Sequence, residues 1–209
     1  MTELRRTFES CSAEDTERLA HSIGRSLAPG DLVTLEGELG AGKTQFARGI
    51  AVALGHRPEL VSSPTFVLMN EYSTPGSRCP LVHIDAYRLG ESDDLESLGL
   101  DGAYRANSVV AVEWASRIAD RLPTPQMRVY IEHSGGASRR ITIETGGTLS
   151  TVPIPAPHRV PCRTCGTPVD PAAPGFPFCS SKCRMADLGK WFSGSYSISR
   201  EIKQTDATE

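Results

Sequence analysis

A glycine-rich stretch that ends in a lysine and a threonine carries the clearest chemical signal in this sequence. Residues 37–44 fit the pattern G-x-x-x-x-G-K-[ST], with Gly37, Gly42, Lys43 and Thr44 at its fixed positions. In such a loop the backbone N–H groups converge on phosphate oxygens, because glycine has no Cβ to block the approach. Lys43 can reach the β- and γ-phosphates, and Thr44 can offer its hydroxyl to Mg²⁺. The pattern therefore predicts a site for a nucleoside triphosphate with Mg²⁺.

Two carboxylates that follow apolar runs are candidates for the same site. Asp85 ends the run 81–84, and Glu113 ends the run 109–112. Carboxylates at the ends of neighbouring strands can hold Mg²⁺ beside phosphates, although surface acids are also common after a strand. Thr65 follows a Ser-Pro pair and could respond to the γ-phosphate as a switch threonine does, or serve only as a turn hydroxyl.

Four clustered cysteines near the end of the chain predict a metal site. Cys162 and Cys165 form a CxxC pair, and Cys179 and Cys183 form a CxxxC pair. Four thiolates complete the tetrahedral shell of Zn²⁺ and leave no open position, so the site would be structural. Two redox pairs or free thiols are the alternative.

The segments around these residues predict the elements that position them. An apolar run at 32–35 predicts a buried strand before the glycine-rich loop, and helical spacing of apolar residues after it predicts a helix that ends at Gly55. A strand, a glycine-rich loop and a helix in this order form the context of a phosphate-binding loop. Further predictions are a helix over 13–27 with a capping-box-like start near Ser12, strands over 66–72, 81–85, 109–112, 127–132 and 140–144, a turn over 134–137, and a short helix over 93–99.

Length and composition bound the organisation of the chain. With 209 residues it can hold one full core and a small appendage, and its net charge of −3 does not mark it as a nucleic-acid binder. We expect an α/β fold, with a P-loop NTPase-type sheet and flanking helices, plus a small C-terminal zinc-ribbon or zinc-knuckle domain. The predicted bounds are 1–150 for the ATPase domain, 151–161 for a Pro-rich linker, 162–200 for the zinc-binding domain and 201–209 for a flexible tail. The start lacks the pattern of a secretory signal and no apolar run reaches the length of a membrane span, so we expect a cytoplasmic protein without a membrane partner.

Four motifs together resemble the TsaE family, the small ATPases of bacterial tRNA threonylcarbamoyladenosine (t6A) biosynthesis. In chain order they are Leu39-Gly40-Ala41-Gly42-Lys43-Thr44, Ser63-Pro64-Thr65, His83-Ile84-Asp85-Ala86-Tyr87-Arg88-Leu89 and Val112-Glu113-Trp114. The resemblance spans about residues 7–145. It implies ATP binding and slow hydrolysis with Mg²⁺, assembly with the TsaB and TsaD proteins, and an indirect relation to tRNA. ATP turnover would support the cycle of the TsaD–TsaB enzyme and would not itself form the modification.

The same resemblance implies roles for individual residues. Thr44 and Glu113 would be Mg²⁺ ligands, and Asp85 would be a second-sphere or catalytic carboxylate. Trp114 would flank the site. The segment from Ser12 to Thr16 would approach the adenine. The nucleotide would be held by Gly37, Gly40, Ala41, Gly42, Lys43, Thr44 and Gln45, and the catalytic group would be Lys43, Asp85, Thr65 and Glu113.

A second resemblance covers about residues 160–200. The run Phe176-Pro177-Phe178-Cys179-Ser180-Ser181-Lys182-Cys183-Arg184-Met185-Ala186-Asp187-Leu188-Gly189-Lys190-Trp191 is similar to the YacG family, small zinc proteins that bind and inhibit DNA gyrase. It implies that Zn²⁺ is bound by the four cysteines, and that a short helix with an apolar patch is formed by Met185, Leu188, Trp191 and Phe192. Whether that patch is core or gyrase contact stays open.

Two other functions fit the phosphate-binding loop. A small P-loop kinase would move phosphate to a metabolite, but such enzymes carry basic residues in a lid, and only Arg88 and Arg105 lie between Asp85 and Glu113. A non-enzymatic regulator would use nucleotide binding to switch an interaction. Measuring ATP hydrolysis with and without TsaB and TsaD separates these functions.

Overall fold

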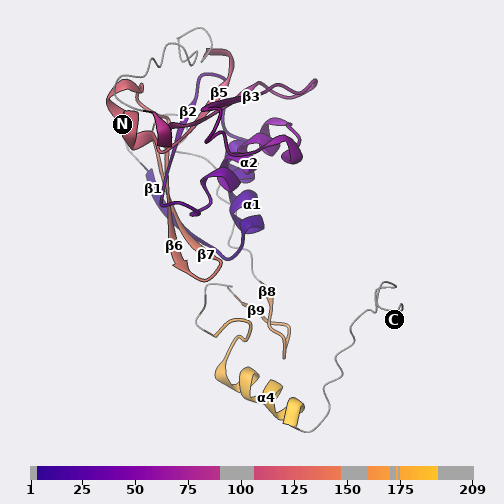
Figure 1. Ribbon diagram of the computed structural model, residues 1–209. Helices are drawn as coiled ribbons and strands as arrows, with labels where there is room; N and C mark the ends of the chain where they lie inside the picture. Colours follow the sequence, from indigo (N-terminus) through magenta and orange to yellow (C-terminus); the bar gives the residue numbers. More distant parts are fainter. Residues whose placement is uncertain (1–3, 90–105, 147–159, 170–172, 174, 193–209) are drawn as a thin grey trace, which may run out of the picture. The chain divides into compact units, whose positions relative to one another are not determined.

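The chain divides into two compact units, Met1–Pro157 and His158–Glu209. The computed structural model describes residues 4–89, 106–146, 160–169, 173 and 175–192 (Figure 1). The predicted helix over 93–99, most of the predicted linker and the predicted tail lie outside these residues. Among the described residues, no helix combines the length and the apolar character needed to cross a membrane.

A seven-stranded mixed sheet forms the centre of the first unit, in the order β1-β7-β6-β2-β5-β4-β3. The three parallel contacts join β2 to β5, β2 to β6, and β4 to β5, and the outer contacts are antiparallel. The strands are β1 (Leu4–Ser10), β2 (Leu32–Glu36), β3 (Met69–Tyr72), β4 (Leu81–Asp85), β5 (Val109–Glu113), β6 (Met127–Gly135) and β7 (Ser138–Thr145).

The two long helices of this unit, α1 (Ala13–Gly24) and α2 (Lys43–Leu54), lie on the same side of the sheet (Figure 1). The side chain of Ser12 accepts a hydrogen bond from the backbone N–H of Asp15, so the predicted start of α1 is confirmed. Helix α1 ends at Gly24, three residues before the predicted end. Gly55 closes α2 in the left-handed conformation, as predicted.

The apolar runs on β2, β4 and β5 are buried because both faces of the sheet are covered. Toward α1 and α2, alternate residues such as Val33 and Leu35 join the larger core with Phe46 and Ile50. On the opposite face, Val110 and other strand residues pack with Ile118 of the 3-10 segment η4 (Ala115–Arg121). The helices approach closely at Gly49, where a Cβ would lie 2.4 Å from the carbonyl oxygen of Glu17.

Of the six predicted strands, five are confirmed and one is partly wrong. Strands β4 and β5 match the predicted apolar runs, and β6 and β7 form the predicted antiparallel hairpin, with a bulge between His133 and Gly135. The strand predicted over 66–72 begins only at Met69. The carbonyl oxygen of Pro64 instead accepts hydrogen bonds from the N–H groups of Val67 and Leu68, so residues 65–68 form a turn. Strand β1 is an addition that the sequence pattern did not predict.

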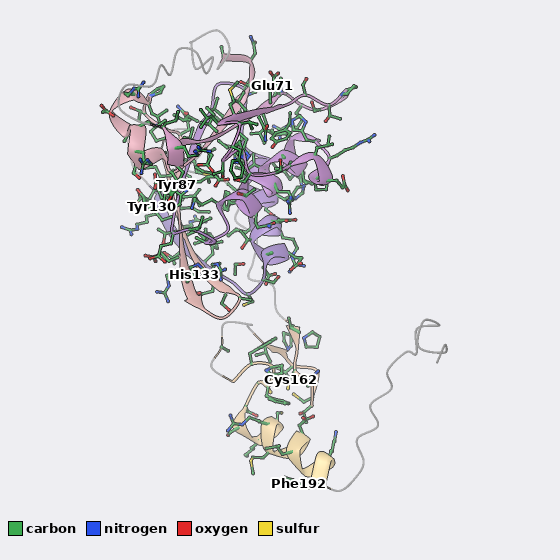
Figure 2. All side chains as sticks on the ribbon, in the orientation of Figure 1. Glu71, Tyr87, Tyr130, His133, Cys162 and Phe192 are labelled. Atoms are coloured by element: carbon green, nitrogen blue, oxygen red, sulfur yellow. The ribbon has the colours of Figure 1, made fainter. Side chains whose placement is uncertain are left out.

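The second unit is small and irregular. Its elements are β8 (Val160–Pro161), β9 (Pro168–Val169) and α4 (Ser181–Phe192). Strand β8 falls inside the segment predicted to be linker, because it pairs with β9 across the first cysteine pair. Among the described residues of this unit, Cys162 and Val169 are the buried core side chains. Figure 2 labels Cys162. So small a core predicts that another interaction holds the unit together.

Candidate nucleotide site and cysteine cluster

The glycine-rich loop lies between the end of β2 and the start of α2, as its pattern predicts. Gly37, Gly40 and Gly42 have φ values of +150°, +76° and +108°, which side chains with a Cβ rarely adopt. A Cβ at Gly37 would also lie 2.3 Å from the carbonyl oxygen of Ile131. These glycines let the loop lie against β6 and turn into α2, whose first N–H groups are available to an anion.

Lys43 is the most enclosed charged side chain of the loop, with 4% of its surface exposed. Its Nζ donates to the carbonyl oxygens of Gly37 at 2.7 Å and Glu38 at 2.9 Å, and it lies 3.7 Å from the centre of the Trp114 ring. Burial lowers the pKa of Lys43, and the carboxylates of Glu113, Asp85 and Glu36 oppose that shift. The ammonium group is thus held inside the loop, where terminal phosphates of a nucleotide would lie.

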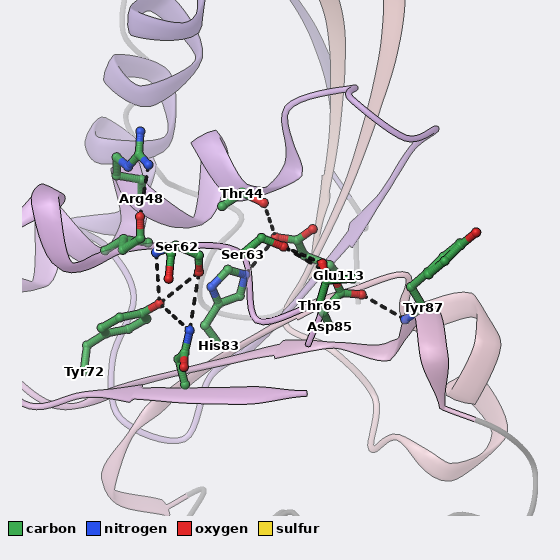
Figure 3. Close-up of polar contacts among 12 residues, drawn as sticks. Thr44, Arg48, Ser62, Ser63, Thr65, Tyr72, His83, Asp85, Tyr87 and Glu113 are labelled. Atoms are coloured by element: carbon green, nitrogen blue, oxygen red, sulfur yellow. Dashed lines mark hydrogen bonds and ion pairs between the residues drawn. The ribbon is translucent and has the colours of Figure 1, made fainter. Parts of the chain in front are cut away.

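Glu113 and Thr44 meet across the gap between β5 and α2 (Figure 3). The Thr44 hydroxyl donates to Glu113 Oε1 at 2.8 Å, and His83 Nε2 lies 2.8 Å from the same oxygen. Glu113 is 3% exposed, so its charge needs such partners. The hydroxyl and the carboxylate are hard oxygen donors of the kind that Mg²⁺ takes. This donor set fits the predicted magnesium site.

Asp85 is held at the end of β4 by three donors (Figure 3). Its Oδ2 accepts from the hydroxyls of Thr65 at 2.5 Å and Ser63 at 3.5 Å, and its Oδ1 accepts from the N–H of Tyr87 at 2.9 Å. In the sheet register Asp85 lies opposite Glu113, so both carboxylates come to the same edge. The structure therefore brings Thr65, Asp85 and Glu113 to the end of the sheet where the loop begins.

Trp114 directly follows Glu113 and adopts the left-handed conformation, with φ of 58°. Its N–H donates to the carbonyl oxygen of Leu35 at 3.0 Å, and its ring lies 5.1 Å from that of Tyr87. An unusual backbone conformation in a non-glycine residue is often found at functional sites. Here it turns the indole toward Lys43, at the flank of the loop.

Arg139, on β7, supports the outer side of the glycine-rich loop. Its guanidinium donates to the carbonyl oxygens of Ala41 at 2.9 Å and Gly40 at 3.3 Å. Arg139 lies opposite Ser10 in the register of β1 and β7. The residue that pairs with the end of β1 in the sheet therefore also holds the loop through its side chain.

The remaining candidate residues are occupied by local contacts. Ser12 caps α1, and buried Thr16 bonds through its hydroxyl to Ser10 Oγ at 2.8 Å. The side chain of Gln45 accepts from Arg48 at 3.0 Å. Roles for these three side chains at a nucleotide stay predictions. The backbone N–H of Gln45 lies in the first turn of α2, where it could still bind a phosphate.

The four clustered cysteines meet in the second unit. Their sulfur atoms all lie within 4.8 Å of one another, with Cys179 Sγ 3.4 Å from Cys165 Sγ and 3.5 Å from Cys183 Sγ. Gly166, with φ of +74°, lets its N–H turn back to the carbonyl oxygen of Cys162 at 2.9 Å. Four sulfurs at such spacing fit a tetrahedral zinc shell.

The sulfurs of the cluster differ in proton affinity. Burial acts to raise the pKa of Cys162, but backbone N–H groups, led by that of Cys179, point at its sulfur and lower the pKa to about 6. Contacts with the thiols of Cys165 and Cys183 raise the pKa of Cys179 to about 12. One sulfur therefore carries negative charge readily while a neighbour retains its proton. A divalent cation would displace such protons on binding.

Two supporting residues were not assigned a role from the sequence. His83 was visible in the H-x-D spacing before Asp85, but only the fold shows its contact with Glu113. Arg139 lies 98 residues from Ala41, and no local pattern links the two.

Comparisons with known proteins match each unit to a different family. The family model described as "Threonylcarbamoyl adenosine biosynthesis protein TsaE" matches residues 10–141, and the model described as "DNA gyrase inhibitor YacG" matches residues 160–209.

Individual relatives agree with the first match. The chain is 39% identical over 140 residues to the tRNA threonylcarbamoyladenosine biosynthesis protein TsaE of Bacillus subtilis, covering 67% of this chain and 85% of that protein. It is 37% identical over 134 residues to the TsaE protein of Treponema pallidum, covering 64% of this chain and 96% of that protein. Among solved structures, Bacillus subtilis YdiB matches with a TM-score of 0.56 and 33% identity over 70% of this chain and 89% of that one.

Proposed function

Because the chain belongs to the TsaE family of threonylcarbamoyl adenosine biosynthesis proteins and carries a YacG-family segment, we propose that it binds and hydrolyses Mg·ATP to support t6A modification of tRNA. The observation that carries this proposal is the convergence of Lys43, Thr44 and Glu113 at the end of β2 and β5. The ammonium group of Lys43 would bind an anion there, and the oxygens of Thr44 and Glu113 beside it would bind a divalent cation.

The residues of this site would divide the work by their chemistry. The N–H groups from Gly40 to Thr44 would hold the β- and γ-phosphates, and Lys43 would neutralise their charge. Thr44 and Glu113 would hold Mg²⁺, which supplies charge neutralisation when bound. Asp85 would orient the attacking water or the metal's water shell, and Thr65, already bonded to Asp85, would respond to the γ-phosphate.

We propose that TsaD and TsaB are the partners of this unit, with tRNA engaged through them in the cytoplasm. Apolar side chains on two loops of the site support a protein partner there. Leu39 in the glycine-rich loop is 83% exposed, and Phe66, beside Thr65, is 87% exposed. Large exposed apolar side chains at a site are typical of surfaces that a partner covers.

Substitution of Lys43 by alanine tests the nucleotide site. The variant removes the only ammonium group held within the described loop, so we expect at least a hundredfold loss of Mg·ATP affinity and no measurable turnover. Isothermal titration calorimetry and a phosphate-release assay measure the two effects. A variant that hydrolyses ATP at the wild-type rate would show that the site is assigned wrongly.

Adding TsaB and TsaD to the ATPase assay separates this function from the alternatives. Stimulated hydrolysis without a phosphorylated small product supports the proposal. A phosphorylated metabolite would point to a kinase, and tight nucleotide binding without turnover would point to a switched regulator.

For the second unit we propose a structural Zn²⁺ held by Cys162, Cys165, Cys179 and Cys183, and binding to DNA gyrase. The support is the sulfur cluster together with the exposed side chains of Met185, Leu188 and Phe192 on α4. Purified gyrase mixed with the zinc-loaded chain tests this, with supercoiling as the readout. If the enzyme supercoils DNA at full rate in a large excess of the chain, gyrase inhibition is not a function of this unit.

A further inference from the structure

His83 is a fully buried polar residue beside the nucleotide site. None of its surface is exposed. Its Nε2 lies 2.8 Å from Glu113 Oε1, and its Nδ1 has no hydrogen-bond partner among the described residues (Figure 3). A buried ring nitrogen without a partner costs stability, and an apolar side chain at this position would avoid that cost. The presence of an imidazole here calls for a function of its other nitrogen.

The sheet fixes where the imidazole can reach. Strands β4 and β5 are parallel neighbours, and His83 lies opposite Ala111, two residues before the Asp85–Glu113 pair. His83 therefore lies deeper in the sheet than the two carboxylates, on the same face. From there it approaches Glu113 from within the core, whereas Thr44 approaches from α2.

The chemistry of the contact sets the direction of the hydrogen bond. An ionised carboxylate can only accept, so Nε2 carries the hydrogen and donates it to Glu113. The Thr44 hydroxyl donates to the same oxygen, Oε1. Both contacts thus anchor one carboxylate oxygen and leave the other oxygen of Glu113 clear of them.

Lys43 is the group that competes for this carboxylate. Its ammonium group is close enough to Glu113 for a favourable charge interaction. A carboxylate that turned toward Lys43 would neutralise the lysine and withdraw both groups from a nucleotide and its metal. The hydrogen bond from His83 opposes that rotation, because it ties Oε1 to the inner side of the sheet.

We propose that His83 is a positioning residue that holds the Glu113 carboxylate in place for Mg²⁺, an inference that rests on the proposed nucleotide site. Groups that orient a metal ligand through a hydrogen bond typically change metal affinity by about 10- to 100-fold when removed. The effect belongs to the metal-dependent part of nucleotide binding, because among the described residues the ring nitrogens of His83 have one hydrogen-bond partner, Glu113, and it is not in the loop.

The test compares ADP binding with and without Mg²⁺ in the full chain. Calorimetric titration of ADP in excess Mg²⁺ and in excess EDTA gives the ratio of the two affinities. We expect His83→Leu to reduce that ratio about tenfold and to leave the affinity in EDTA within about twofold of wild type. His83→Gln, whose amide can donate from a similar position, should restore the ratio to within about threefold of wild type.

Leu81→Ala is the matched control, because Leu81 is fully buried on the same face of β4 and joins only the apolar core. It should lower the unfolding temperature without changing the ratio. If His83→Leu does not fold, His83→Phe replaces it in the test, because phenylalanine keeps a planar ring but has no N–H.

The outcomes distinguish this inference from the proposed function. If wild type shows no Mg²⁺-dependent binding of ADP or ATP, the proposed nucleotide site itself is wrong. If wild type shows it and a folded His83→Leu or His83→Phe keeps the full ratio, the positioning role of His83 is wrong while the proposed function stands. If Leu81→Ala reduces the ratio as much as His83→Leu does, the loss comes from disturbed packing and the positioning role of His83 is likewise wrong.

Discussion

At the scale of single residues, the nucleotide site is built from charged groups that almost no solvent reaches. Lys43, Asp85 and Glu113 are each less than 5% exposed. Buried charges are tolerated only where hydrogen bonds and opposite charges surround them, and each of these side chains has both. Removing one group therefore leaves the others uncompensated, so effects of substitutions here will not add.

Substitution of Arg139 tests whether its guanidinium on β7 holds the glycine-rich loop in place. In Arg139→Ala the carbonyl oxygens of Gly40 and Ala41 lose a charged donor, which is worth about 1–3 kcal/mol at a partly buried site. We expect about tenfold weaker ADP binding by calorimetry, because the loop N–H groups are no longer fixed toward the phosphates.

Arg140→Ala is the control for that substitution. Arg140 is the next residue along β7, and it pairs with Glu9 at an exposed position. Such pairs contribute about 0–1 kcal/mol, so this variant should bind ADP as wild type does. Equal affinity losses in both variants would mean that the loop does not depend on Arg139.

At the scale of elements, the parallel strands decide where the chemistry gathers. Strands β2, β4 and β5 run in the same direction, so their carboxyl ends meet at one edge, with the loop on β2 and a carboxylate on each of the other two. The 3-10 segment η4 then turns the chain away after Trp114 and covers the face opposite the helices. Apolar cores cover both faces of the sheet, so the carboxyl-end edge of these strands is the part of the sheet left to form a site.

The end of α2 and the segment before β4 are joined by a buried histidine that should make stability pH-dependent. His56 is 4% exposed, its Nδ1 lies 3.2 Å from Thr74 Oγ1, and its Nε2 lies 3.0 Å from the carbonyl oxygen of Cys79. Burial lowers the pKa of His56, and the hydrogen bond to Cys79 opposes the shift. The unfolded chain then binds a proton more readily than the folded one as pH falls below about 6.5, so folding stability falls with it.

Calorimetric unfolding of wild type and His56→Gln between pH 8 and pH 5 measures this contribution. We expect His56→Gln to be less stable at pH 8 but to lose less stability between pH 7 and pH 5. Both proteins contain the same cysteine cluster, so its pH dependence cancels when the stability of one protein is subtracted from that of the other. Parallel curves for the two proteins over this range would show that His56 is not the titrating group.

At the scale of the whole molecule, two units of different physical character share one chain. The first buries a large apolar core on both faces of its sheet. The described part of the second has two buried core side chains and a cluster of four sulfurs. Zinc binding in small domains contributes about 10–16 kcal/mol at neutral pH, which is enough to fold a unit with almost no core.

Cys179→Ser tests whether the units are independent. We expect loss of bound zinc, measured by native mass spectrometry, and loss of the helical signal of α4. The reason is that Cys179 contacts the other three cysteines of the cluster, two through its sulfur and one through its backbone N–H. ATP hydrolysis should remain within about twofold of wild type. ATPase activity that disappears together with the zinc would contradict two independent units.

The sequence alone determined the parts that depend on neighbouring residues. The glycine positions of the loop, the apolar runs of β2, β4 and β5, and the cap at Ser12 are local requirements of backbone conformation, so the printed order of residues reveals them. The spacing of the cysteines likewise predicted their cluster, because a zinc shell needs four ligands that often come as two closely spaced pairs.

Only the tertiary structure decided the contacts between distant segments. Strand β1 exists because it pairs with β7, more than 120 residues further along the chain, and its polar sequence alone does not favour a strand. Residues 65–68 turn rather than extend, and this turn brings Thr65 to Asp85. The contacts of His83 with Glu113 and of Arg139 with the loop depend on strand order and register, which no short window of sequence contains.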